Sequence, residues 1–550
     1  MGYASTLYSI KRGFLILGFT GYTASGCTTT VNYISAIDKP KLPKKINNIN
    51  INEIERFKNL QREWDDIEWN NFINIEVALV IMMFAFDQCL KYNYSNENLK
   101  LIKEIVGDYK NDLQGLKFLH RPSSDLKNPK NAKKLVLAYQ TTKKLSDKIK
   151  SALSRGHIYN YIKILQKYGD DIRKYGKIEV KKEISDSNNI LILPEAVRKI
   201  IKAYRISEKN NQFTIDAFRN PFEVEYFRRR YSEFYLVCIT RAEEERKLQL
   251  YKNKLDYDNF IELSNTERCK DKDKKEIFEW ITSQNIPECT QKASYYINNT
   301  SVNHLRLEIA RLLCLIKHPG CFQPTYDEFH MEIAMTARQK SGCISRKVGA
   351  VVVGSDNSIM GIGWNQPPNG QESCINRTTY ELIESENSTR FSDYELSESF
   401  KKHIQTKYCD KELDVPFCFK DELYSLEKNT ASHASKKNEF TRSLHAEERA
   451  FLSIKEHSHH LKNCTLFTTD SPCTLCAKKA YHMGVNRIVF IEEYPGITNI
   501  QTLKSGIRKN EISIEQFEGA AGEAYDKLFS SIMPEKDYLN ILIHEKKNNL

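Results

Sequence analysis

The fold and the chemistry are indicated by two short stretches, "SLHAEERA" (443–450) and "SPCTLCAKKA" (471–480). They contain His445-Ala446-Glu447, then 24 residues, then Pro472-Cys473-Thr474-Leu475-Cys476. This H-x-E…P-C-x-x-C pattern supplies three zinc ligands and leaves a fourth position for water, which is how catalytic zinc sites are built. We predict that His445, Cys473 and Cys476 hold the zinc ion. Glu447 is then the catalytic acid–base and not a ligand.

The residue types fit the removal of an amino group from a nucleobase. Zinc lowers the pKa of its water to roughly 7, and the hydroxide attacks an amino-bearing ring carbon. Glu447 carries protons from that water to the ring nitrogen and to the leaving ammonia. We expect Ser471 to be a helix N-cap and Pro472 to take the first helical position. The alternative is a structural zinc or two buried thiols.

The surrounding sequence alternates helices with strands. The pattern predicts helices over 327–340, 444–455 and 472–482. It predicts a hairpin of strands 348–353 and 358–364 around "GSDN" (354–357), and further strands over 464–469 and 487–492. Residues 366–443 form a long polar insertion. We place a linker at 315–325, where Pro and Gly are close together, and a zinc-dependent deaminase domain over 326–550.

The first half opens on a stretch with two incompatible interpretations, "FLILGFTGYTASGCTTTV" (14–31). It resembles a lipoprotein export signal ending at Cys27, and it also resembles a strand leading into a phosphate-binding loop, G-x-x-x-x-G-x-T. Ala24 stands where such export signals usually have Leu, and only the loop explains Gly21 and Gly26. Thr28 could reach a magnesium ion, whereas Cys27 replaces the lysine that would neutralise phosphate charge.

The elements around this loop predict a parallel sheet. Strands are expected at 14–19, 212–216, 234–240 and 295–297, with helices at 28–37 and 242–250 and throughout 95–190. We assign 1–314 to a P-loop nucleotide-binding, regulatory domain, with Asp216 as an acidic partner for Mg²⁺. Three arginines could add positive charge, although we expect each to be solvated: Arg173, Arg219 and Arg246. The fold class is therefore α/β, an N-terminal P-loop NTPase/kinase-like sheet domain followed by a cytidine deaminase-like α/β/α domain.

Composition sets wide bounds. The 550 residues carry a formal net charge of +11, which suits anionic partners such as nucleotides or nucleic acid but also follows from a Lys-rich background. The 14 cysteines form no disulfide-like framework, which favours reduced thiols, metal sites and a cytoplasmic protein. No apolar run reaches the roughly 20 residues of a membrane span. We expect no membrane partner.

Residues 327–500 resemble the deoxycytidylate deaminase family through "SGCISRKVGAVVV" (341–353), "GIGWNQPPNG" (361–370) and the two zinc motifs. The whole chain resembles a narrower group, the bacterial anti-phage dCTP deaminases, in which a P-loop domain is fused to such a deaminase; "TIDAFRNPFEVEYF" (214–227) is typical of that group. The resemblance implies conversion of dCTP, and of dCMP, to the uracil nucleotide plus ammonia, which depletes the dC pool during phage infection. It also implies regulation by a small RNA or a nucleotide, and we expect a homo-oligomer.

The resemblance also implies roles for further residues. Asn365, in G-x-N-x-x-P, is expected to contact the sugar or base, and Arg346 and Lys347 to meet phosphate. A second, structural zinc site is implied whose candidate ligands are Cys343, Cys374, His433 and Glu439, with Cys418 as a competitor.

Two other functions stay open at this stage. The zinc signature is shared with RNA and single-stranded DNA editors, which the positive charge permits. Alternatively the chain is a nucleotide kinase or binding protein whose deaminase half only binds.

Overall fold

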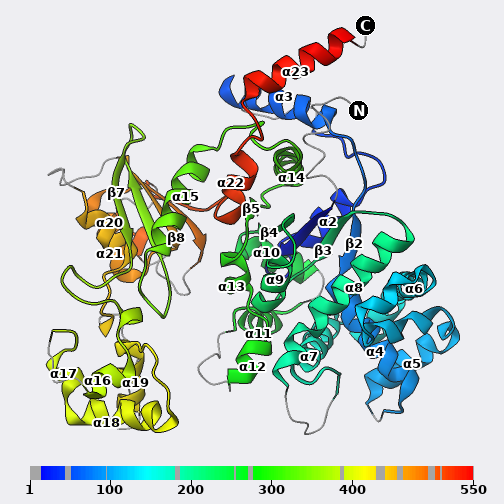
Figure 1. The fold of residues 1–550 in the computed structure, drawn as a ribbon, viewed down its shortest axis with the longest axis horizontal. Helices are drawn as coiled ribbons and strands as arrows, with labels where there is room; N and C mark the ends of the chain where they lie inside the picture. Colours follow the sequence, from blue (N-terminus) through cyan, green and yellow to red (C-terminus); the bar gives the residue numbers. More distant parts are fainter. Residues whose placement is uncertain are drawn as a thin grey trace. The chain divides into compact units, whose positions relative to one another are not determined.

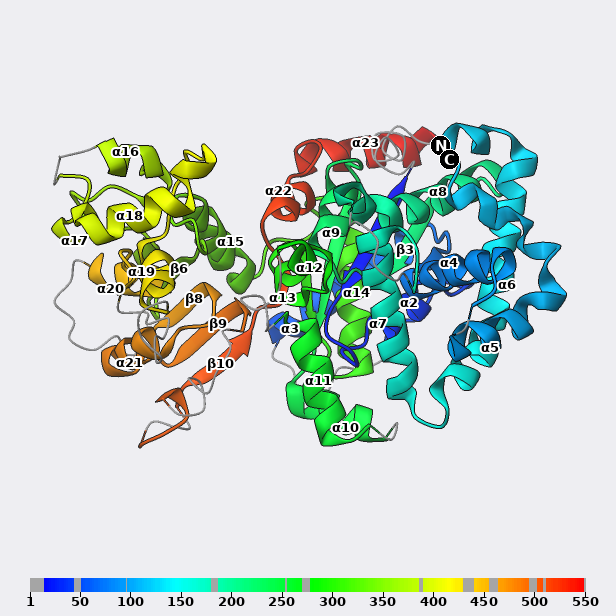
Figure 2. The ribbon, with the colours of Figure 1, turned by 90° about the horizontal axis from the view of Figure 1, so that it is seen from below.

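The structure is a computed structural model that describes residues 14–43, 51–94, 96–179, 186–252, 255–269, 277–384, 389–428, 440–454, 463–493, 502–507 and 511–548. The chain divides into two compact units, unit 1 (1–323 and 518–550) and unit 2 (324–517). Figure 1 and Figure 2 show their helices and strands. Among the described helices, none is long and apolar enough to cross a membrane.

Unit 1 is built on a six-stranded sheet in the order β11-β5-β4-β1-β3-β2, in which β11 alone is antiparallel to its neighbour. Its strands are β1 (Leu15–Thr20), β2 (Ile73–Glu76), β3 (Gln212–Asp216), β4 (Phe234–Thr240), β5 (Tyr295–Asn298) and β11 (Gly519–Ala520). The strands predicted at 14–19, 212–216, 234–240 and 295–297 are confirmed to within a residue or two. The short β2 and β11 were missed.

Helices surround this sheet. They are α2 (Cys27–Ile34), α3 (Ile51–Asp66), α4 (Val77–Lys91), α5 (Glu97–Val106), α6 (Pro129–Ser154), α7 (Ile158–Tyr175), α8 (Ile192–Ser207), α9 (Pro221–Arg228), α10 (Glu243–Lys252), α11 (Tyr257–Glu267), α12 (Ile277–Thr282), α13 (Ile286–Gln291), α14 (Val302–Lys317), α22 (Glu523–Phe529) and α23 (Glu535–Asn548). Alternate residues of β1 (Leu15, Leu17 and Phe19) pack on α2, α3 and α14 in one apolar core. The largely helical character of 95–190 is confirmed.

The C-terminal segment belongs to unit 1, not to the deaminase domain to which the sequence analysis assigned it. β11 pairs with β5, and Ala524 and Leu528 of α22 are buried in the core beside α14. On the same segment, Glu518 accepts hydrogen bonds from the backbone of Asn298 and, at 2.8 Å, from the ring of His304 on α14. The predicted 326–550 boundary is therefore wrong at its C-terminal end, because a local pattern does not reveal that a distant strand completes the first sheet.

Unit 2 contains a five-stranded sheet in the order β10-β9-β8-β6-β7. Its strands are β6 (Gly349–Val353), β7 (Ile359–Trp364), β8 (Thr465–Asp470), β9 (Arg487–Glu492) and β10 (Ser513–Gln516). β6 and β7 form the predicted hairpin, in which Asn357 takes a positive φ of 66°. β8, β9 and β10 run parallel, side by side in Figure 2. The four strands predicted along the chain are confirmed as β6, β7, β8 and β9, and β10 is a fifth strand that was not predicted.

Helices cover both faces of the unit 2 sheet, with α15 (Tyr326–Gln339) packed on β6 and β8, and α20 (Ala446–Leu452) packed against β7. α21 (Thr474–Met483) follows β8. The insertion forms a small helical cluster of its own, seen in yellow in Figure 1, which consists of α16 (Thr379–Glu384), α17 (Asp393–Leu396), α18 (Glu398–Lys407) and α19 (Phe419–Lys428). A core of aromatic and aliphatic side chains, among them Phe391, Phe400 and Phe417, holds the cluster together.

Candidate active site

Two glycines on β7 bring the first helix of the site against the sheet. A Cβ at Gly363 would lie 2.0 Å from the carbonyl oxygen of Ala446, and one at Gly361 would lie 2.2 Å from that of Ala450. The backbone of α20 can therefore approach β7 more closely than any side chain would permit. His445 is the N-cap residue of α20, and Glu447 lies in its first turn, only 4% exposed.

The two cysteines lie at the start of α21, just beyond the carboxyl end of β8. Cys473 is the N-cap residue and Thr474 is the first helical residue. The prediction that Ser471 caps the helix and that Pro472 begins it is therefore wrong by two residues, because Ser471 instead donates its backbone N–H to Glu492 of β9. Although the helix starts two residues later than predicted, Cys473 and Cys476 still lie within one turn of each other. Both thiols therefore face the start of α20.

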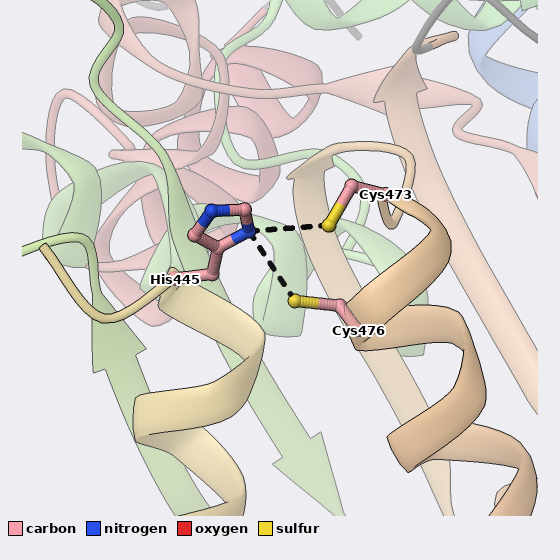
Figure 3. A group of neighbouring side chains, drawn as sticks. All are labelled: His445, Cys473 and Cys476. Carbon is pink, nitrogen blue, oxygen red and sulfur yellow. Dashed lines mark hydrogen bonds between the residues drawn. The ribbon is translucent and has the colours of Figure 1, made fainter. Parts of the chain in front are cut away.

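His445, Cys473 and Cys476 converge on one point, as Figure 3 shows. The Nδ1 atom of His445 lies 3.3 Å from the sulfur of Cys473 and 3.5 Å from that of Cys476. A tetrahedral zinc ion with bonds of about 2.3 Å to sulfur and 2.0 Å to nitrogen places such ligands about 3.5 Å apart. The three donors therefore fit zinc without rearrangement. Among the described residues, this is one of two groups of His, Cys, Asp or Glu side chains whose ligand atoms all lie within 4.8 Å of one another.

The electrostatics of the group suit metal binding and proton transfer. The hydrogen bond from Cys476, aided by His445, lowers the pKa of Cys473 to about 4, so this sulfur is ready to act as a thiolate ligand. The start of α21 also favours negative charge. Burial raises the pKa of Glu447 to about 7, close to the value at which a carboxyl group both accepts and donates protons at neutral pH.

A cavity of about 220 Å³ opens above these residues. His445, Glu447 and Cys473 form part of its lining, and three basic residues, Arg346, Lys420 and Arg442, face it from other segments. Lys420 and Arg442 belong to the insertion and its return to the sheet. The sequence analysis missed both, because no motif surrounds them. For Arg442, the only available signal was its position three residues before His445.

The residues assigned by resemblance take different positions. Asn365 lines the cavity, but its side-chain amide holds a backbone loop: it accepts from the N–H of Val348 at 2.8 Å and donates to the carbonyl of Arg346 at 2.5 Å. Arg346 lines the cavity and forms an ion pair with Asp470. Lys347 is exposed and does not line the cavity.

The second zinc site stays a prediction. Cys343, Cys374 and Cys418 all line the cavity, and burial, with Cys343 close by, raises the pKa of Cys374. The other two assigned ligands, His433 and Glu439, lie outside the described residues.

In unit 1, the loop 21–26 connects β1 to α2. Gly21 and Gly26 have φ angles of 154° and 114°, and a Cβ at either would lie 2.4 Å or less from a neighbouring atom of Ile239 or Asn299. Both positions therefore require glycine. β1 lies between β3 and β4, where the order of connections reverses, and the carboxyl ends of strands at such a switch point form ligand crevices.

Beyond the loop, the Thr28 hydroxyl donates to the carboxylate of Asp216 at the end of β3, at 2.8 Å. Burial raises the pKa of Asp216 to about 6. Cys27 is buried, and burial raises the pKa of its thiol to about 12, so it is neutral and supplies no positive charge. The export interpretation fails here, since cleavage before Cys27 would remove β1 from the middle of the sheet.

The three nearby arginines are not all solvated, as the sequence analysis expected. Arg173 is buried and pairs with Glu223, and Arg246 is buried against the ring of Tyr22 in the loop. Arg219 is half-buried and pairs with Glu267, which also accepts a hydrogen bond from the backbone N–H of Thr23 at 3.0 Å. Two loop residues thus contact charged side chains: Tyr22 contacts Arg246, and Thr23 contacts Glu267.

Comparison with known proteins places the site in a family. The zinc-binding region of cytidine and deoxycytidylate deaminases matches residues 324–492. The deoxycytidylate deaminase of Enterobacteria phage T2 is 30% identical over 166 residues, which is 30% of this chain and 78% of the phage enzyme. The deoxycytidylate deaminase of Schizosaccharomyces pombe is 26% identical over 202 residues, 37% of this chain and 48% of that protein, so the chain spans about half of this relative's length.

Among solved structures, the dCMP deaminase of cyanophage S-TIM5 in its apo form shares 22% identity with a TM-score of 0.20, covering 36% of this chain and all of that one. The matched zinc-binding region, residues 324–492, contains His445, Glu447, Cys473 and Cys476, and the phage T2 enzyme is matched over 78% of its own length. The chain therefore belongs to the cytidine and deoxycytidylate deaminase family.

Proposed function

We propose that unit 2 catalyses the hydrolytic deamination of free deoxycytidine nucleotides, dCTP foremost and dCMP as well. The observation that carries the proposal is the convergence of His445, Cys473 and Cys476 beside the buried Glu447, at a cavity that basic side chains line. The relatives reported above are deoxycytidylate deaminases, which supports a cytosine nucleotide as the substrate.

The roles of the residues follow from their geometry. A zinc ion held by the three ligands would supply an acidified water as the nucleophile. Glu447 accepts the proton of that water and delivers protons to N3 of the cytosine ring and to the departing amine. The C4–O bond forms first as N3 takes a proton, and the C4–N bond to the protonated amine then breaks, so one water is consumed and one ammonia is released. Burial favours both steps, because a carboxyl group with a pKa near neutrality exchanges protons readily.

The basic residues favour a free nucleotide over a nucleic acid. Arg346, Lys420 and Arg442 lie within one cavity and provide compact positive charge suited to a terminal polyphosphate. A long strand would instead need an extended basic groove with aromatic stacking platforms. Two of these cations already have partners, since Arg346 pairs with Asp470 and Arg442 with Glu395, so the preference for dCTP over dCMP rests on the resemblance of the whole chain to dCTP deaminases.

The test is a set of substrates offered to the pure protein. We expect ammonia release from dCTP and dCMP, with Glu447→Gln as the blank, and little from cytidine or from cytosine-containing oligonucleotides. Turnover of oligonucleotides alone would favour the editing alternative and overturn the proposal. Turnover that persists unchanged in Glu447→Gln would reject the assigned chemistry.

For unit 1 we propose a regulatory nucleotide-binding role of the P-loop type. One support is the position of loop 21–26 at the switch point of the sheet. A second is the contact of Thr28 with Asp216, two oxygen-bearing side chains of the kind that hold Mg²⁺ beside a bound nucleotide. The neutral Cys27 leaves the phosphates without their usual lysine, so we expect binding with slow hydrolysis. Faster hydrolysis in Cys27→Lys would support this account. Failure of the wild-type protein to bind a labelled nucleotide would reject the proposed role of unit 1.

The biological proposal is depletion of the dC pool as a defence against phages, in the cytoplasm and by a homo-oligomer whose activity a small RNA or a nucleotide controls. Cells expressing the wild type should restrict phage plaques, and cells expressing Glu447→Gln should not. Equal plaque numbers would argue against a defensive role and leave the enzymatic proposal untouched.

A further inference from the structure

A second cluster of metal-ligating side chains lies in unit 1, away from the residues discussed so far. Oxygen, nitrogen and sulfur atoms of Glu63, His318 and Cys321 all lie within 4.8 Å of one another. The Nδ1 atom of His318 is 3.1 Å from a carboxylate oxygen of Glu63. These residues are partly buried, with side-chain exposures of 17% for Glu63 and 16% for His318.

The backbone brings these residues together for definite reasons. His318 is the C-cap residue of α14, and Glu63 extends from α3, which packs on α14. The chain then turns back, as the N–H of Cys321 donates to the carbonyl of His318 at 3.2 Å. Gly320 makes the turn possible, since its φ is +84° and a Cβ there would lie 2.9 Å from Ser531. The turn therefore brings the sulfur of Cys321 within 4.8 Å of a ring nitrogen of His318.

A further thiol lies next to the cluster. Cys314 precedes His318 by four residues, so the two share one face of α14. Burial raises the pKa of the Cys321 thiol, and the nearby Cys314 and Glu63 raise it further. The spacing Cys314-x₃-His318-x₂-Cys321, with Glu63 from another helix, thus provides the sulfur, nitrogen and oxygen donors from which tetrahedral zinc sites are made.

The alternative to a metal site is a hydrogen-bonded pair of Glu63 and His318, and this pair accounts for fewer of the contacts described above. Such a pair needs neither Cys321 nor the turn at Gly320 that delivers it. The ring of His318 also packs on Tyr538 of α23, 5.0 Å between centroids, which fixes its orientation. An ion at this point would join α3, the end of α14 and the segment after it, where the C-terminal helices also pack.

We propose that Glu63, His318 and Cys321 bind a structural zinc ion in unit 1 and that Cys314, which lies next to them, moves in as the fourth ligand when the ion binds. Binding would release the thiol protons, and because the ligands come from separate elements the ion would stabilise unit 1 as a whole. This proposal is independent of the deaminase chemistry, because none of the four residues belongs to unit 2.

The test uses the full-length protein and counts metal. We expect Cys321→Ser and His318→Gln each to lose one zinc per chain relative to the wild type, as measured by elemental analysis after dialysis. The matched control is Cys89→Ser, which alters another buried thiol of unit 1, one that donates only to the carbonyl of Leu99. It should keep the full zinc content, and deaminase turnover should persist in all three variants, which separates this site from the catalytic one.

A second measurement guards against variants that do not fold. His445→Ala should weaken the catalytic site, so cobalt added to the zinc-free His445→Ala protein should still give a thiolate-to-cobalt charge-transfer band, and Cys321→Ser in that background should reduce it. Chelation should also lower the unfolding temperature of His445→Ala, but not that of the double variant. Equal zinc contents in wild type, Cys321→Ser and His318→Gln, with an unchanged cobalt band, would overturn the proposal.

Discussion

Glu395 holds the helical insertion together, and its replacement by Gln gives the sharpest test of how that insertion supports the cavity. Its carboxylate accepts from Arg377 at 2.5 Å and from Arg442 at 3.1 Å. Arg377 is fully buried, and its guanidinium lies beside the rings of Phe391 and Phe417, at 4.7 and 5.4 Å from their centroids. One carboxylate therefore balances two guanidinium groups within an apolar cluster.

The magnitude follows from this geometry. Glu395→Gln keeps the shape but leaves the buried Arg377 charge without its counter-ion, which costs about 3–5 kcal/mol for a fully buried pair. Each 1.36 kcal/mol is a factor of ten, so the opening of the insertion should become about 10²- to 10⁴-fold more favourable. Domains of this size are stable by roughly 5–15 kcal/mol, so the insertion should loosen while the sheet of unit 2 stays folded.

Hydrogen exchange measured by mass spectrometry can detect this difference locally. Peptides covering α16 to α19 should lose about two to four orders of magnitude in protection, by the conversion just given, while peptides of β6 and β8 should change little. Glu398→Gln is the matched control, because Glu398 is exposed at the start of α18. Unchanged protection in Glu395→Gln, or an equal loss in both variants, would refute the reasoning from burial.

Three further outcomes are expected. Glu447→Gln should lower kcat about 10²- to 10⁴-fold while zinc content stays unchanged, because the role proposed for this residue is proton transfer and not metal binding; loss of zinc would contradict this role. Lys420→Ala should raise KM for dCTP about tenfold, roughly the weight of one charged contact, whereas Lys347→Ala should not, because Lys347 is outside the cavity lining. The hydrogen bond to Glu518 raises the pKa of His304, so this pair stabilises the fold below pH about 6.5 and loses its effect as pH rises through the raised value. Glu518→Gln should therefore lower the unfolding temperature more at pH 6 than at pH 8, as scanning calorimetry would measure; an equal decrease at both would argue against the pair.

The zinc centre could be predicted from the sequence because each of its parts is local. H-x-E spans three residues and P-C-x-x-C five, and the strand before α21 is buried along its whole length. The exact start of α21 was not predicted, because Ser and Pro are common at helix starts, whereas here the N–H of Ser471 bonds to Glu492 of β9 and the helix begins at Thr474. The glycines of β7 that admit α20 were visible in "GIGW", yet only the packing shows why they are needed.

Features that depend on distant contacts were not predictable in this way. β11 is two residues long and joins a sheet whose other strands lie more than 200 residues earlier, so no periodicity marks it. Arg173 and Arg246 resemble ordinary surface arginines in sequence, and only the fold shows that they are buried. The Glu63–His318–Cys321 cluster was likewise invisible, since Glu63 is more than 250 residues from its partners.

The proposed function divides unit 2 into a part that carries out the chemistry and a part that selects the substrate. The ligands and Glu447 are carried by α20 and α21, which are fixed to the sheet by close glycine contacts and by β8. Lys420 and Arg442, in contrast, are carried by the insertion, whose own core and whose Glu395 hold it in place. A loosened insertion should thus raise KM for the triphosphate more than it lowers kcat. If Glu395→Gln instead abolished kcat at saturating dCTP with zinc retained, the insertion would have to take part in the chemical step as well, and the division between the two parts of the cavity would be wrong.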